Sequence, residues 1–116
     1  EITIKEIHHP EKGITNVTVK LETIEMESDI VKARELITRH KSNGNHIICG
    51  YDDHSRLVAG TKSGEYYLWD PDLESTKLDD NINGEHSLDW FYSMYASEKK
   101  YANKSAEYWV YSVTFS

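Results

Sequence analysis

Polar and apolar residues alternate in the first part of the chain. Ile2 and Ile4 alternate with polar neighbours in residues 1–7, and the same alternation runs through residues 14–24. A period of two is typical of strands that bury one face and leave the other in water. Residues 9–13 contain a proline and a glycine and join the two runs as a turn. These segments therefore predict a β-hairpin.

The apolar spacing changes to that of a helix after residue 28. Ser28 or Asp29 is suited to cap the helix, and apolar residues then recur at three- and four-residue intervals. Basic residues concentrate in the last turns, where they interact favourably with the helix dipole. Asn43 and Gly44 provide a stop signal. The pattern predicts a helix over residues 29–42.

Three short strands with turn signals between them follow this helix. They are predicted at residues 46–51, 56–61 and 65–70. Connections this short join antiparallel neighbours, so the three strands form a meander. Pro71 ends the last strand, because proline cannot donate to the ladder of backbone hydrogen bonds.

The last third of the chain contains a long polar stretch, a second helix and a final strand. Residues 71–86 are rich in Asp, Asn and Gly and carry no strand or helix pattern. Ser87 is suited to cap a helix that extends to about Asn103. The final strand is predicted at residues 107–116, with one face formed by Trp109, Tyr111, Val113 and Phe115.

These elements predict one α+β domain over residues 1–116. We expect a mostly antiparallel sheet of about five to six strands with two helices packed on one face. A chain of 116 residues has the usual size of a single domain and buries one core.

Charge and composition exclude several classes of protein. Aromatic residues make up 11% of the chain, which argues against intrinsic disorder. The formal charge is -7, with 20 acidic and 13 basic residues, so the basic stripe of a nucleic-acid binder is missing. No apolar stretch approaches the ~18 residues that cross a bilayer. We expect a soluble, cytoplasmic protein without a nucleic-acid or membrane partner.

Acidic and aromatic residues are interleaved between Tyr66 and Tyr95. Tyr and Trp anchor protein interfaces, and carboxylates around them attract a basic partner and accelerate association. We predict a partner-binding face that consists of Trp69, Asp70, Asp72, Glu74, Asp79, Asp80 and Glu85.

The predicted function is that of an acidic binding protein, not of an enzyme. A bacterial inhibitor or immunity protein that neutralises a basic nuclease toxin is one concrete form, because its carboxylates replace nucleic-acid phosphates in the active site. A nucleic-acid mimic that blocks a DNA-binding protein is a rival of the same class. The sequence gives no indication of a homo-oligomer.

Two alternatives come from other classes of protein. His46, Asp52 and His54 are close in sequence, and histidine with a carboxylate supports general acid–base chemistry in a small enzyme or ligand-binding domain. The chain is also compatible with an accessory domain of a longer protein, because it begins at Glu1 without a methionine.

Metal and cofactor motifs are incomplete. Residues 79–84 match the first half of a calcium loop, D-x-N-x-N-G, but Trp90 occupies the position of the bidentate glutamate. No pair of the six histidines has the spacing of a helical zinc site. We predict no metal or cofactor, and we expect the single cysteine, Cys49, to be a buried and unreactive thiol.

Residues 46–53 and 66–71 resemble the histidine half of papain-like cysteine peptidases. A histidine opens a strand, Gly50-Tyr51 follows, and an aromatic strand ends at Asp70-Pro71. The helix at 29–42 lacks the nucleophilic cysteine of that family, and Cys49 lies on the same strand as His46. Thiol catalysis is therefore not expected from this resemblance. We attribute the resemblance to a similar composition of the strands.

Overall fold

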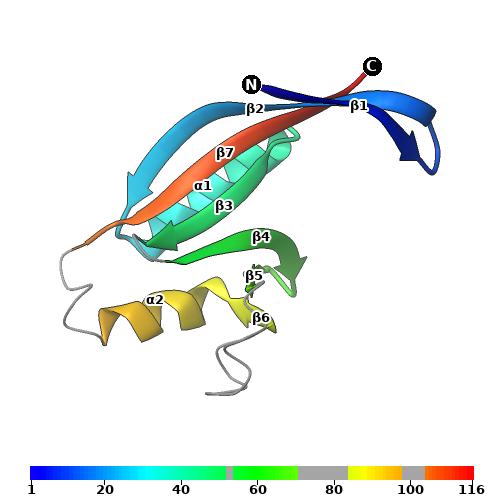
Figure 1. Ribbon diagram of the computed structural model, residues 1–116. Coiled ribbons are helices and arrows are strands. Elements are labelled where there is room, and N and C mark those ends of the chain that lie inside the picture. The colour runs from blue at the N-terminus through cyan, green and yellow to red at the C-terminus, as the bar shows by residue number, and fades with distance from the viewer. Residues whose placement is uncertain (52–53, 71–83, 98–103) are drawn as a thin grey trace.

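One antiparallel sheet of seven strands carries two helices on one face in the computed structural model of the protein (Figure 1). The structure describes residues 1–51, 54–70, 84–97 and 104–116. The strand order is β1-β2-β7-β3-β4-β5-β6, and every described pair is antiparallel. The predicted α+β class is confirmed, and the sheet has more strands than the five to six expected.

The helices and strands follow the predicted order with one additional strand, β6, and the second helix ends earlier than predicted. Their bounds are β1 Ile2–His9, β2 Gly13–Glu27, α1 Ile30–Ser42, β3 His46–Tyr51, β4 His54–Lys62, β5 Glu65–Asp70, β6 Gly84–Ser87, α2 Leu88–Ala96 and β7 Ala106–Phe115. β6 has only four residues and lies in the segment where no strand was predicted, because a strand this short shows no measurable alternation.

Helix α1 begins and ends at the residues that the sequence indicates. The Asp29 carboxylate accepts hydrogen bonds from the backbone N–H groups of Val31 and Lys32 at 2.9 and 3.0 Å, so Asp29 is the N-cap. Gly44 follows the helix with a φ of 79°, a left-handed conformation that glycine adopts without strain. The buried residues of α1 are Ala33, Leu36 and Ile37.

Helix α2 follows β6 directly. The Ser87 hydroxyl accepts a hydrogen bond from the Trp90 N–H at 3.1 Å, which confirms the predicted cap. The helix ends at Ala96, and residues 98–103, which were predicted to extend it, lie outside the described residues. Within the described ranges, no helix is long and apolar enough to cross a membrane.

The core fills the space between the two helices and the covered face of the sheet. Leu88 and Phe91 of α2 meet the buried face of α1 and the strands, and Cys49 is fully buried among them, as predicted. Burial raises the pKa of the Cys49 thiol to about 12, so this sulfur is unreactive near neutral pH.

Hydroxyl groups form a chain through this core. The Tyr92 hydroxyl donates to the Glu27 carbonyl at 3.2 Å and therefore accepts from the Tyr108 hydroxyl at 2.6 Å. The Cys49 thiol also hydrogen-bonds to Tyr108. Burial and these partners raise the pKa of Tyr108, which remains neutral. These hydrogen bonds satisfy buried polar atoms and link α2, β7 and β3 to one another.

A charged cluster attaches α1 to β2. The Glu25 carboxylate accepts two hydrogen bonds from Arg39 at 2.7 and 2.9 Å and a third from His40. Burial opposes the charge on Glu25, but the hydrogen bonds from His40 and Arg39 outweigh it and lower the pKa of Glu25.

Substitution of this carboxylate, Glu25→Gln, is expected to lower the free energy of unfolding by about 0.5–1 kcal/mol at neutral pH. Because the folded pKa of Glu25 lies below the ordinary value of 4.5, its contribution is present above pH 4.5 and is lost as the pH falls through the folded pKa. Urea unfolding at pH 7 and pH 3 measures both effects. The exposed Glu35 of α1 is the control, and an equal pH response of Glu35→Gln and Glu25→Gln contradicts the prediction.

Candidate interaction surface

The two faces of the sheet differ in what covers them. We call the face under α1 and α2 the inner face and the opposite one the outer face. Ala106, Tyr108 and Val110 of β7 point to the inner face and are buried. Because strand residues alternate between faces, Trp109 and Tyr111 point to the outer face, where both are only partly buried.

A row of apolar side chains crosses the outer face from β2 to β5. Five residues lie directly opposite one another in the strand register: Ile24, Trp109, Ile48, Leu57 and Trp69. We call this row the apolar stripe. Ile24, Leu57 and Trp69 each leave 44% of their surface exposed. The row combines three exposed side chains with Ile48 and Trp109, which are partly buried, and it is the candidate for an interaction surface.

Acidic side chains border the apolar stripe. Glu85 of β6 lies opposite Trp69 in the register and forms an ion pair with Lys62. Glu107 is next to Trp109 on β7 and accepts a hydrogen bond from the indole N–H at 3.2 Å. The surface thus has an apolar centre and a charged rim, which is the anatomy of protein interfaces.

No protein-family model, curated protein sequence or solved structure matches the chain. The residues of the outer face are therefore the basis for assigning a function. They include two of the seven predicted binding residues, Trp69 and Glu85.

Asp70 belongs to the interior and not to the binding face. It follows Trp69 on β5, so it points to the opposite, inner face, and it is buried. Its carboxylate lies 2.8 Å from His54 Nε2 and 3.2 Å from Arg56 Nη2. The prediction that Asp70 contacts a partner is corrected accordingly, because a carboxylate in this position balances a buried guanidinium.

The other four predicted binding residues lie outside the described residues: Asp72, Glu74, Asp79 and Asp80. Their role in binding stays a prediction. The same holds for the calcium loop at residues 79–84, of which only Gly84 is described. Among the described residues, no group of three or more His, Cys, Asp or Glu side chains is arranged to hold a metal ion.

The histidines of the alternative enzyme site lie far apart. His54 pairs with Tyr51 at one end of β3, whereas His46 begins that strand five residues away. Five residues of strand span about 16 Å. His46 also points to the outer face, beside Tyr111, and His54 to the inner face with Asp70. These two histidines therefore do not form a common site, and Asp52 lies outside the described residues.

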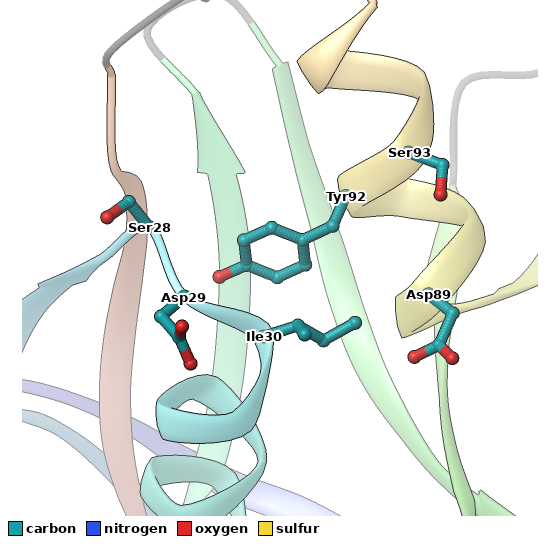
Figure 2. Close-up of a pocket in the computed structure, with 6 residues that line it drawn as sticks. All are labelled: Ser28, Asp29, Ile30, Asp89, Tyr92 and Ser93. Atoms are coloured by element: carbon teal, nitrogen blue, oxygen red, sulfur yellow. The ribbon is translucent and has the colours of Figure 1, made fainter.

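An open pocket of about 470 Å³ lies between the start of α1 and α2 (Figure 2). Tyr92 and Ile30 form its apolar wall, and the carboxylates of Asp29 and Asp89 flank it. Asp29 caps α1, and Asp89 forms an ion pair with Arg34 of α1. Both carboxylates thus have structural roles, and the pocket is a weaker candidate than the apolar stripe.

The sequence identified part of this surface. Trp69 was predicted as a binding residue, and Trp109 was placed on one face with Tyr111, but Ile24 and Leu57 were not singled out. A sequence pattern does not give the strand order, and only the order and register align these residues in one row.

Proposed function

We propose that the chain is a protein-binding module of the inhibitor or immunity type and that its partner covers the apolar stripe. The exposure of Trp69 beside Leu57 on an open sheet face is the observation that carries this proposal. Tryptophan at the centre of an interface contributes more binding energy than most residues, because it buries a large area at low entropic cost. A broad sheet face suits another protein better than a small ligand, which needs a concave site.

The charge of the chain supports a basic partner. The formal charge is -7, and Glu85 and Glu107 border the apolar stripe. Such a surface attracts cationic proteins over long distances and repels the phosphates of nucleic acids. A nuclease toxin is a partner of this kind, because its active site carries Arg and Lys side chains for phosphate. A DNA-binding protein, inhibited by mimicry, is the other.

The test begins with the affinity-tagged chain in a native lysate at low salt, and mass spectrometry identifies the proteins that elute as salt rises. The captured protein is then purified, and its affinity is measured by calorimetry for wild type and for Trp69→Ala. We expect Trp69→Ala to bind at least ~30-fold more weakly, which corresponds to about 2 kcal/mol. Activity assays of the captured protein distinguish a nuclease from a DNA-binding regulator.

The control is Val31→Ala, which removes an exposed apolar side chain from α1, away from the outer face. We expect this variant to bind like wild type. Equal affinities of Trp69→Ala and wild type would overturn the stripe as the binding site. An affinity that is independent of salt would overturn the basic character of the partner.

A further inference from the structure

One end of the sheet projects beyond the helices (Figure 1). It consists of β1, the first part of β2 and the last part of β7, that is, residues 2–20 and 112–116. We call it the extension. Its register places two apolar rows on the outer face, Ile2–Val19–Val113 and Ile4–Val17–Phe115. Ile7 lies on the same face, opposite Thr15.

The helix side of the extension is mostly polar; the exception is Ile14, which lies opposite His8 on this side and leaves 67% of its surface exposed. Thr3 lies opposite Thr18, Thr18 lies opposite Thr114, and Lys20 lies opposite Ser112. Were the extension free in water on both sides, nothing would favour the concentration of apolar residues on one face. Segregation of this kind is typical of a sheet that buries one face and solvates the other.

The apolar face of the extension is nevertheless exposed in the single chain. Ile2, Ile4 and Phe115 leave 65%, 49% and 41% of their surface in water. The exposed region includes β1, which is the edge strand of the sheet: every residue of β1 except His9 is exposed. Contiguous apolar patches larger than a few hundred Å² are rare on monomers and mark interaction sites.

Composition and charge distinguish this patch from the apolar stripe. It is aliphatic apart from Phe115, and it has no tryptophan. Residues 1–20 contain three Glu and three Lys, so their formal charge is zero and the -7 of the chain resides elsewhere. Near Phe115, the Lys12 ammonium and the His9 ring lie 5.6 and 5.0 Å from the ring centroid. A basic partner gains no attraction here, and two copies meet without repulsion between the extensions.

We propose that a second copy of this chain packs its extension on this patch, outer face to outer face, about a two-fold axis. Two such sheets stack ~10 Å apart, with interdigitating Ile and Val side chains as in a β-sandwich. The seven apolar side chains leave about 500 Å² per copy to be buried, just below the ~600 Å² per partner of the smallest specific interfaces, so side chains around the patch contribute to the interface as well. The interface goes beyond the proposed function and does not depend on it.

The mass of the full chain in solution tests this interface. Sedimentation velocity from about 1 to 100 μM is expected to give twice the chain mass of 13.4 kDa. Val19→Lys places an unpaired charge in the centre of the patch and should weaken dimerisation at least ~100-fold. Thr18→Lys is the matched control, because this neighbour points to the polar side of the same strand, and it should dimerise like wild type.

A monomeric wild type over the whole range overturns the proposal, and so does a Val19→Lys variant that dimerises like wild type. Circular dichroism confirms that both variants are folded. Trp69→Ala should still dimerise, so loss of partner binding and loss of the dimer are separate outcomes.

Cross-linking tests the orientation of the two copies. Cys49 is buried and unreactive, so a single introduced cysteine reports on its own position. Val19→Cys should be linked between two copies by a bismaleimide reagent whose reach exceeds the ~10 Å between stacked sheets, whereas Thr18→Cys should remain largely uncross-linked. Equal cross-linking of the two variants overturns the face-to-face arrangement.

Discussion

Asp70→Ala is expected to lower the free energy of unfolding by about 3–5 kcal/mol. Asp70 and Arg56 are each only 2% exposed, and the carboxylate lies within ion-pair distance of Arg56 and His54. Removal of the carboxylate leaves the Arg56 guanidinium charged in the interior without this partner, because arginine does not lose its proton. Urea unfolding, followed by tryptophan fluorescence, measures the change.

The control for this prediction is Glu85→Gln, which disrupts the solvent-exposed ion pair between Glu85 of β6 and Lys62 of β4. Exposed pairs contribute about 0–1 kcal/mol, so the control should be near wild type. The double variant Arg56→Met with Asp70→Leu removes both charges and should be more stable than Asp70→Ala. A loss below about 1 kcal/mol in Asp70→Ala contradicts the assigned role of this carboxylate.

Phe91→Ala is the second variant with a large expected effect, a loss of about 3–5 kcal/mol in unfolding free energy. Phe91 is fully buried in α2, and its ring centroid lies 5.3 Å from the Arg56 guanidinium carbon. The truncation leaves a cavity between α2 and the sheet and removes the cation–π contact with Arg56. Thermal and urea unfolding should both show the loss.

Phe91→Leu retains most of the side-chain volume and should lose clearly less stability than Phe91→Ala. Val31→Ala truncates an exposed apolar residue in the other helix and should change stability by less than about 0.5 kcal/mol. Equal stabilities of Phe91→Ala and Val31→Ala would contradict the assignment of Phe91 to the core.

Local sequence signals were sufficient for most elements of the fold. Asp29, one of the two predicted candidates, and Ser87 cap the two helices, because a carboxylate or hydroxyl satisfies the first backbone N–H groups without help from distant residues. The strands at 46–51 and 65–70 have the predicted bounds, since turn residues flank each of them. The strand at 84–87 was missed because four residues give no period.

The faces of the strands were harder to predict. In β5, Trp69 and Asp70 are adjacent, and general hydrophobicity favours a buried tryptophan and an exposed aspartate. The structure has the reverse arrangement, because Asp70 faces Arg56 and His54 on the covered side. A buried carboxylate depends on partners from another strand, and one segment of sequence does not contain them.

The sequence alone determined the α+β class, the helix caps, the antiparallel meander and the burial of Cys49, because these follow from interactions between neighbouring residues and from hydrophobic periodicity. Only the tertiary structure decided the strand order, which places β7 between β2 and β3 and aligns Ile24, Trp109, Ile48, Leu57 and Trp69 in one row on the outer face. It also decided which face of each strand the helices cover. Both are properties of long-range pairing, whose energy comes from residues far apart in the chain.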